Sequence, residues 1–239
     1  MSLAKPSGTA RAVLFDVDFT LIYPGPTFQG VGYRHFCARH GIGVDPAAFE
    51  QAVAGASTLL DSSGGIYDPQ VFIDYTKRII ELMGGSGPGV ERASRDIYDE
   101  WAACQHFSLY EDVADVLRGL HRAGLKIGLI SNTQRCLTSF QKHFELDGLF
   151  SAAVSSSDHG YMKPHPSIFE AALRALDTEP GDAVMVGDSL AHDIEGALLC
   201  GMRAVLVSRS GAPQACPPEV PVIQSLRELP PLLAGRAQT

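Results

Sequence analysis

Two aspartates and a threonine near the start of the chain form the pattern Asp16-x-Asp18-x-Thr20. The residues before them, 12–15, read Ala-Val-Leu-Phe, and a short apolar run of this kind predicts a buried strand. Residues two apart on an extended chain point the same way, so we expect Asp16 and Asp18 to face one site. Carboxylates this close repel one another unless a cation or a proton lies between them. The pattern therefore predicts chemistry at the tip of a strand.

Three further polar clusters lie at or near the ends of predicted strands. In chain order they are Ser131-Asn132 after the apolar run 125–130, Lys163-Pro164 in the connection after 152–155, and Gly187-Asp188-Ser189 after 183–186, with Asp193 on the turn or helix that follows. In an open parallel sheet, ligands bind beyond the carboxyl ends of the strands. We therefore expect all four clusters to meet in one site.

The residue types in these clusters indicate phosphoryl chemistry. Four aspartates would crowd one pocket, and an all-oxygen set of this kind suits a hard cation, for which Mg²⁺ is the common choice beside phosphate. Lys163 adds a fixed positive charge, Ser131 adds a hydroxyl, and N–H groups at the start of the next helix attract anions. One carboxylate can attack phosphorus, while a second protonates the leaving oxygen and later deprotonates a water.

Strands that alternate with helices are predicted to position these clusters. From about residue 110 onward, we expect strands at 125–130, 152–155, 183–186 and 204–207, with helices at 112–123, 133–144, 166–176, 191–200 and near 226–233. This alternation predicts a parallel sheet that is covered by helices on both faces. Between the first strand and this region, helical spacing covers 27–40, 46–60, 69–83 and 90–104, without a convincing strand pattern. This block is therefore predicted to be an all-helical insertion in an α/β fold.

Composition narrows the class of protein. The 239 residues are 45% hydrophobic and 19% charged, which is ordinary for a globular chain. The formal net charge of −8 argues against broad binding to nucleic acid or to an anionic membrane. No apolar stretch is long enough to span a bilayer, and residues 1–9 lack the apolar core of a signal peptide. Five cysteines without C-x-x-C spacing fit a reducing compartment, so we expect a cytoplasmic protein.

The four clusters together resemble the four ordered motifs of the haloacid dehalogenase superfamily. The similarity extends from about residue 11 to residue 209. It implies a Rossmann-like three-layer core with a parallel sheet, made of residues 1–23 and 106–239. The block 24–105 resembles the helical C1 cap of the branch that contains dehalogenase-like and phosphoglycolate-phosphatase-like enzymes. Many members of the family carry glycine where Phe19 stands in this chain.

The resemblance implies a role for each matching residue. Asp16 would be the nucleophile that becomes an aspartyl-phosphate, and Asp18 would be the general acid and base. Mg²⁺ would be held by Asp16, Asp188 and Asp18, the last through its backbone carbonyl. The residues implied to bind and orient the substrate phosphoryl group are Thr20, Ser131, Asn132 and Lys163. Thr20 would also orient its loop. Asp193 would support the metal or Lys163 without contacting the substrate.

We therefore expect a Mg²⁺-dependent phosphatase that hydrolyses a small phosphate monoester through an aspartyl-phosphate. The cap would close over the substrate and exclude bulk water. The expected partner is a small phosphorylated metabolite, with no nucleic acid and no membrane. Phosphoglycolate, sugar phosphates, nucleotides and sialic-acid phosphates are all served by capped relatives, and the cap residues are expected to choose among them.

Three alternatives remain open. A 2-haloacid dehalogenase needs the nucleophile but no metal, and both Asp18 and Asp188 speak against it. A phosphomutase usually departs from threonine at the position of Thr20 and carries a further catalytic base in its cap. A non-catalytic binding or regulatory protein on the same scaffold would be expected to lose one of the motif residues, and none is lost.

Overall fold

The computed structural model describes most of the chain, in three stretches: residues 9–62, 65–211 and 216–234. The chain divides into two compact units. The first joins Met1–Tyr23 to Leu109–Thr239, and the second is the continuous block Pro24–Ser108. That the second unit acts as a cap stays a prediction.

The chain passes between the units within two short strands. These strands, β2 (Ile22–Pro24) and β3 (Phe107–Leu109), form a two-stranded sheet. These strands were not predicted from the sequence, because three residues are too few for an alternating pattern to show.

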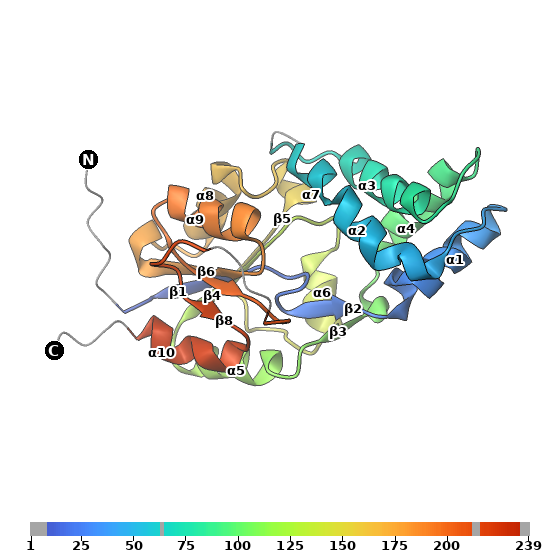
Figure 1. The fold of residues 1–239 in the computed structure, drawn as a ribbon. Helices are drawn as coiled ribbons and strands as arrows, with labels where there is room; N and C mark the ends of the chain where they lie inside the picture. The colour runs from blue at the N-terminus through green and yellow to red at the C-terminus, as the bar shows by residue number, and fades with distance from the viewer. Residues whose placement is uncertain (1–8, 63–64, 212–215, 235–239) are drawn as a thin grey trace. The chain divides into compact units, whose positions relative to one another are not determined.

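A six-stranded parallel sheet forms the middle of the first unit (Figure 1). In sheet order, its strands are β5 (Ala152–Ser155), β4 (Lys126–Ser131), β1 (Ala12–Phe15), β6 (Ala183–Gly187), β7 (Arg203–Val207) and β8 (Val222–Ile223). Five of them were predicted, and the two-residue β8 was not. All four side chains of β1 are buried, and the strand has neighbours on both edges. A strand covered on both faces needs a continuous apolar run, which residues 12–15 supply.

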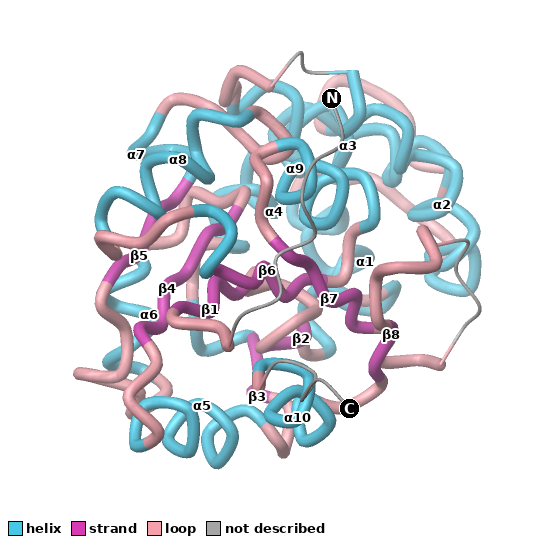
Figure 2. Tube along the Cα trace, turned by 90° about the vertical axis from the view of Figure 1, so that its left-hand side faces the viewer, coloured by secondary structure: helices cyan, strands magenta, loops and turns pink. Residues whose placement is uncertain are grey.

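Helices cover both faces of this sheet. They are α5 (Val113–Arg122), α6 (Leu137–His143), α7 (Ser156–His159), α8 (Pro166–Ala175), α9 (Gly196–Leu199) and α10 (Leu229–Leu233). In Figure 2, α8 and α9 lie above the strands, and α5 and α10 lie below them. One buried apolar cluster includes Phe169 of α8 together with Leu14 and Met185 of the sheet. The predicted Rossmann-like three-layer α/β class is therefore confirmed.

The helix after β4 begins later than predicted. It was expected over 133–144, but α6 begins at Leu137. The residues before it form a turn, in which the Thr133 hydroxyl oxygen accepts a hydrogen bond from the Arg135 N–H at 3.0 Å. Threonine competes in this way with the helical hydrogen bonds of the backbone. The helix predicted from the spacing of apolar residues therefore began too early in the sequence.

The helix after β6 also departs from its prediction. Over 191–200 an ordinary helix was expected, but the segment begins as a wider π-helical turn, Leu190–Glu195, which continues into α9. Ser189 caps this turn, because its side chain accepts a hydrogen bond from the His192 N–H at 3.2 Å. Asp193 lies on the turn itself. Turns of this kind are frequent at functional sites.

The second unit is helical. Its α-helices are α1 (Gly30–Arg39), α2 (Phe49–Ala56), α3 (Pro69–Leu82) and α4 (Val90–Trp101). Each falls within one of the helices predicted for this block. The start of α3 shows why: the Asp68 carboxylate accepts a hydrogen bond from the Gln70 N–H at 2.9 Å, and Pro69 takes the first helical position.

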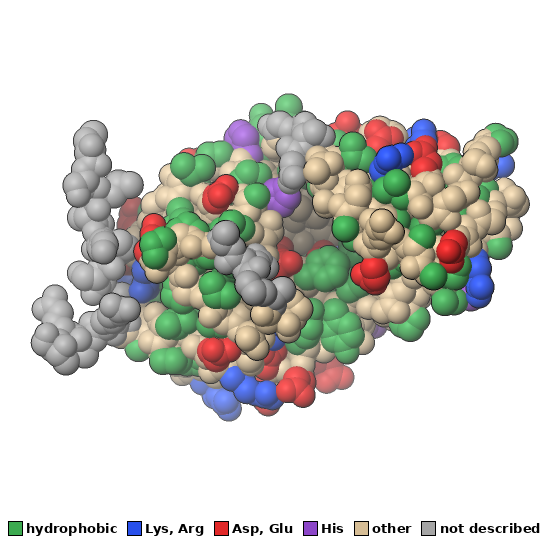
Figure 3. All heavy atoms as spheres, viewed as in Figure 1, with side chains coloured by type: hydrophobic (Ala, Val, Ile, Leu, Met, Phe, Trp, Pro, Cys, Tyr) green, Lys and Arg blue, Asp and Glu red, His purple; other side chains and the backbone are tan. Residues whose placement is uncertain are grey.

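The surface and the helix lengths bear on possible partners. Among the described helices, none is long and apolar enough to cross a membrane. On the face shown in Figure 3, Lys and Arg side chains are interspersed with Asp and Glu side chains. A mixed surface offers no extended positive field to a polyanion. That the chain avoids nucleic acid stays a prediction.

A buried carboxylate joins the C-terminal segment of the first unit to the loop that follows β1. Asp112 Oδ2 accepts hydrogen bonds of 2.7 Å from Arg209 Nη1 and from the Ser225 hydroxyl. It also accepts one of 2.7 Å from the Leu226 N–H, and Arg209 Nη2 donates to the Thr20 carbonyl oxygen at 2.7 Å. Burial raises the pKa of Asp112, but these hydrogen bonds and the arginine charge outweigh it, so the net pKa lies below its usual value.

We expect Asp112→Asn to lower the free energy of unfolding by about 2 kcal/mol near neutral pH, because the charged hydrogen bond to Arg209 is lost. The pKa of Asp112 is lower in the folded chain than its unfolded value of 3.8. The carboxylate therefore contributes stability that is present above pH 3.8 and is lost as the pH falls through the folded-state pKa. Urea unfolding near neutral pH and at about pH 3 should show this difference from the wild type narrowing in acid.

The control for this measurement is Asp115→Asn, which changes an exposed carboxylate in the first turn of α5, the helix that Asp112 precedes. It should alter stability by no more than about 0.5 kcal/mol. A difference between Asp112→Asn and the wild type that is the same at both pH values would contradict the role given to the ionised Asp112.

Candidate active site

The carboxyl ends of three neighbouring strands bring the predicted clusters together. β1 pairs in parallel with β4 on one side and with β6 on the other. Asp16 directly follows β1, Ser131 is the last residue of β4, and Asp188 directly follows β6. Because parallel strands end at the same edge, the tips of β1, β4 and β6 define one site, at the place predicted from the sequence.

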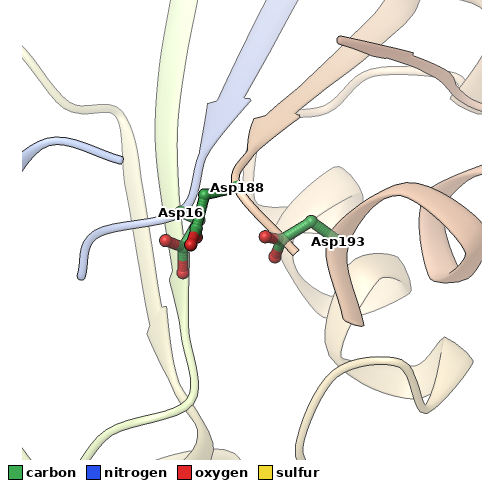
Figure 4. A group of neighbouring side chains, drawn as sticks. All are labelled: Asp16, Asp188 and Asp193. Atoms are coloured by element: carbon green, nitrogen blue, oxygen red, sulfur yellow. The ribbon is translucent and has the colours of Figure 1, made fainter. Parts of the chain in front are cut away.

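Three aspartates form the acidic part of this site. Asp16, Asp188 and Asp193 each offer a carboxylate oxygen, and these three atoms lie within 4.8 Å of one another. Figure 4 shows Asp193 reaching toward the other two from the turn that follows β6. Asp16 and Asp193 are buried, and Asp188 is half-buried. Three carboxylates this close need compensating positive charge.

Lys163 supplies part of that charge from the connection after β5. Its Nζ donates hydrogen bonds of 2.6 Å to Asp16 Oδ1 and to Asp193 Oδ1, and one of 3.0 Å to the Ile130 carbonyl oxygen. Burial lowers the pKa of Lys163, but the charges of the two aspartates outweigh it, and the net pKa is raised. Lys163 therefore remains a cation in the interior.

The pKa values of the carboxyl groups are raised as well, but here burial is the largest cause. Burial raises the pKa of Asp16 to about 6, although the charge of Lys163 opposes the rise. Burial also raises the pKa of Asp188 well above its usual value, and the charges of Asp16 and Asp193 add to this effect. Raised carboxyl pKa values in one cluster are typical of functional sites, because such groups are held together at a cost in stability.

Asn132 holds the backbone that carries the lysine. Its side-chain Nδ2 donates to the Lys163 carbonyl oxygen at 2.9 Å, and its Oδ1 accepts from the Lys163 N–H at 2.7 Å. Thr20 is buried, and its hydroxyl donates to Asp188 Oδ1 over a long 3.4 Å. Ser131 is buried as well. That Thr20, Ser131 and Asn132 contact a phosphoryl group stays a prediction.

The Asp18 carboxylate is not part of the group formed by Asp16, Asp188 and Asp193, and it is bound by an arginine that was not predicted from the sequence. Arg135 Nη1 donates to Asp18 Oδ1 at 2.9 Å and to Asp18 Oδ2 at 3.1 Å. Burial raises the pKa of Asp18, and the charge of Arg135 opposes the rise. The segment around Arg135 was predicted to be helix, where an arginine normally points to solvent, so its type and position alone gave no signal.

Glycine is required at residue 187 by the close approach of Asp193. A Cβ atom at Gly187 would lie 2.3 Å from Asp193 Cγ, inside any van der Waals contact. Asp193 is fixed further by its Oδ2, which accepts a hydrogen bond from the Ser189 N–H at 3.0 Å. The Gly-Asp-Ser sequence at the end of β6 thus leaves space for the Asp193 carboxylate at Gly187 and binds it through the Ser189 N–H.

Phe19 occupies a strained position between Asp18 and Thr20. Its φ is +65°, in the left-handed region that costs a residue with a Cβ about 1–2 kcal/mol. The backbone turns back here, since the Phe19 N–H donates to the Ile22 carbonyl oxygen at 2.7 Å. The side chain is 45% exposed. A positive φ explains why glycine suits this position in the family that the motif resembles.

Comparison with known proteins gives the class of this chain. Residues 10–201 match the family model of the haloacid dehalogenase-like hydrolases. A ribulose-1,5-bisphosphate 5-phosphatase from Halopiger xanaduensis is 33% identical over 208 residues, which cover 84% of this chain and 86% of that protein. Human N-acylneuraminate-9-phosphatase is 33% identical over 166 residues, 66% of this chain and 65% of that protein.

A solved structure agrees with these sequence matches. The crystal structure of a HAD phosphatase from Thermococcus onnurineus has a TM-score of 0.65 with this chain at 25% sequence identity. The match covers 94% of this chain and 98% of that one. The protein therefore belongs to the haloacid dehalogenase-like hydrolase family and is a hydrolase, which confirms the resemblance inferred from the four motifs.

The strain at Phe19 predicts an inverted order of two variants. In an ordinary helical position, glycine is less stable than alanine by about 1 kcal/mol. We expect Phe19→Gly to be more stable than Phe19→Ala by about 1 kcal/mol, because alanine keeps the left-handed strain and glycine does not. Urea unfolding of the two variants measures this difference.

The matched pair is Arg118→Gly and Arg118→Ala, at an exposed position inside α5. Here alanine should be the more stable variant. Finding alanine favoured to the same extent at both positions would show that residue 19 does not adopt a positive φ.

Proposed function

We propose that the protein is a Mg²⁺-dependent phosphatase that hydrolyses a small phosphate monoester through an aspartyl-phosphate on Asp16. The observation that carries this proposal is the state of the Asp16 carboxylate. Its Oδ1 is held by Lys163, and its Oδ2 is buried with no hydrogen-bond partner among the described residues. A buried carboxylate oxygen without a partner is costly unless a ligand or a reacting atom completes it.

The donor set fits a divalent cation. Asp16, Asp18, Asp188 and Asp193 bring four carboxylates to this region, against two cationic side chains, Lys163 and Arg135. With all six groups ionised, two negative charges remain, and one Mg²⁺ would balance them. Carboxylate oxygens are the ligands that Mg²⁺ prefers.

Asp16 and Asp188 are the proposed side-chain ligands, together with the Asp18 carbonyl, because Asp193 already binds Lys163 and the Ser189 N–H. Bound Mg²⁺ would offset the charge of the incoming phosphoryl oxygens and of the transition state. Asp193 would then act from outside, by keeping Lys163 and the turn after β6 in place.

The chain's own groups would divide the work in two steps. Lys163 donates all three of its N–H groups to the protein, so it would exchange one of these hydrogen bonds to hold a phosphoryl oxygen beside the Ser131 hydroxyl. An Asp16 oxygen would then attack phosphorus, and the bond to the leaving oxygen would break as Asp18 gives that oxygen its proton. In the second step a water attacks the aspartyl-phosphate and its proton passes to Asp18. The bond between Asp16 and phosphorus then breaks, which releases phosphate and restores both carboxyl groups.

The named relatives support a phosphatase over the other reactions of the scaffold. Two of the similar proteins described above are named for phosphate ester hydrolysis, of a sugar bisphosphate and of an acylneuraminate phosphate. Asp18 and Asp188 are not needed by a dehalogenase and are both present. We propose a small phosphorylated metabolite as the substrate, the second unit as a substrate-selecting cap and the cytoplasm as the compartment.

Phosphate release from 4-nitrophenyl phosphate tests the reaction. We expect turnover with Mg²⁺, loss of turnover with EDTA, and a loss of at least about 10³-fold in Asp16→Asn, since the amide cannot attack phosphorus. A panel of phosphorylated metabolites, assayed in the same way, covers the case in which the second unit rejects aryl phosphates.

Asp147→Asn is the control, because Asp147 is exposed and lies outside the site. It should retain wild-type turnover. Activity that persists in EDTA but is lost in Asp16→Asn would contradict the Mg²⁺ assignment and favour dehalogenase-type chemistry. No phosphate release from any compound would contradict the phosphatase itself.

Metal binding can be tested without turnover. A ligand that binds only the folded state stabilises it by about 2.7 kcal/mol at a concentration a hundred times its Kd. We therefore expect millimolar Mg²⁺ to raise the melting temperature of the wild type and of Asp147→Asn, and to leave Asp188→Asn almost unchanged. An equal rise in Asp188→Asn would show that the cation binds elsewhere.

A further inference from the structure

Arg135 is one of the most deeply buried polar side chains of the described chain, and its guanidinium binds the Asp18 carboxylate. Its side chain is 0% exposed, whereas that of Asp18 is 17% exposed. Both contacts come from one nitrogen, Nη1, at 2.9 and 3.1 Å from the two carboxylate oxygens. A charged hydrogen bond removed from water in this way is stronger than an exposed one, and its geometry is better defined.

The backbone that carries Arg135 is tied down on both sides. The Thr133 hydroxyl accepts the Arg135 N–H, and the Thr133 carbonyl oxygen accepts a hydrogen bond from the Ser157 N–H at 3.3 Å. One residue earlier, Asn132 is clamped to the backbone of Lys163. Arg135 therefore lies on the turn that begins at Asn132, and Asn132 also binds the backbone of Lys163.

Asp18, in contrast, lies on a tight and strained loop. The next residue, Phe19, has a positive φ, and a β-bridge joins Asp18 to Ile22. A partly exposed aspartate on such a loop has several side-chain rotamers, and only some point at a group bound beside Asp16. Proton transfer needs the donor and the acceptor oxygens within about 3 Å of each other.

We propose that Arg135 is a positioning residue that holds the Asp18 carboxyl group in the orientation from which it protonates the leaving oxygen. This inference rests on the proposed phosphatase function. The proton still comes from Asp18, and Arg135 neither gains nor loses one. Arg135 acts by restricting Asp18, so its removal lowers the fraction of bound substrate whose leaving oxygen meets an aligned acid.

If Arg135 orients the acid Asp18, the effect of removing Arg135 should depend on the leaving group of the substrate. A purely structural role for Arg135 predicts no such dependence. A leaving group that departs readily as an anion needs little help from an acid, whereas a poor leaving group needs a proton as the bond breaks. Phenol has a pKa of about 10, and a nitro group makes it a stronger acid and a better leaving group. Phenyl phosphate should therefore suffer more from a misplaced Asp18 than 4-nitrophenyl phosphate, although the two substrates have nearly the same shape.

The experiment compares kcat/KM for these two esters in the wild type, Arg135→Met and Arg135→Lys. This ratio of constants reports on steps up to formation of the aspartyl-phosphate, in which the leaving group departs. For Arg135→Met we expect about a 100-fold loss with phenyl phosphate and a loss of less than about tenfold with 4-nitrophenyl phosphate. Arg135→Lys keeps the charge but not the planar fork, so a smaller loss with the same preference is expected.

Two further variants tie the effect to Asp18. Asp18→Asn should show the same preference for the good leaving group, because it removes the acid itself. In that background, Arg135→Met should add less than about a threefold further loss with phenyl phosphate, since neighbouring residues that act as a unit are not additive. The matched control is Arg122→Met, which changes an exposed arginine of α5. It should leave kcat/KM for both esters at the wild-type values.

The outcomes separate this inference from the proposed function. Suppose that the wild type releases phosphate but that Arg135→Met and Arg135→Lys lower kcat/KM by the same factor for phenyl phosphate and for 4-nitrophenyl phosphate. Arg135 then only stabilises the fold, and the inference is wrong. If KM rises for both esters and inhibition by inorganic phosphate weakens in parallel, Arg135 binds the phosphoryl group instead. A wild type that releases no phosphate from any ester would sink the proposed function first, and melting temperatures identify a variant that has not folded.

Discussion

The site depends on one buried ion pair network, in which the ammonium group of Lys163 lies between Asp16 and Asp193. Both hydrogen bonds are 2.6 Å long, and all three side chains are almost fully buried. Removing either aspartate would leave a buried cation short of a partner, and removing the lysine would leave two carboxylates beside Asp188 without compensation. Buried charges of this kind are kept only where the remaining contacts are good.

Much of the surrounding backbone serves that network. Asn132 binds both backbone polar groups of Lys163, so the lysine starts from a fixed position. Gly187 leaves the space that the Asp193 carboxylate fills, and the Ser189 N–H binds the same carboxylate. The backbone at the end of β1 is bound to β6, because the Asp16 N–H donates a hydrogen bond to the Val186 carbonyl oxygen at 2.9 Å. Asn132, Gly187 and Ser189 therefore fix the positions of Lys163 and Asp193.

The fold and the outline of the site could be predicted from the sequence, since both follow from strong local patterns. The apolar runs before Asp16, Ser131 and Asp188 set three strands, and parallel strands must end at one edge. Arg135 could not be found in this way. Arg135 is buried because Thr133 forms a turn there and because Asp18, 117 residues away in the chain, binds its side chain. The helical spacing of this segment predicts neither the turn nor the contact. The short strands β2, β3 and β8 also depend on pairing partners more than on their own residues.

The order of the strands in the sheet has a consequence for how the protein comes into being on the ribosome. β1 emerges first, but its neighbours β4 and β6 follow only after the continuous block Pro24–Ser108 has been made. Lys163 and Asp16 are separated by 147 residues, and long-range pairing of this kind forms slowly. The helical unit can close its own contacts while the rest of the chain is still being delivered. β1 has to wait for its neighbours, so the cluster of Asp16, Lys163 and Asp188 is among the last parts of the nascent chain to assemble.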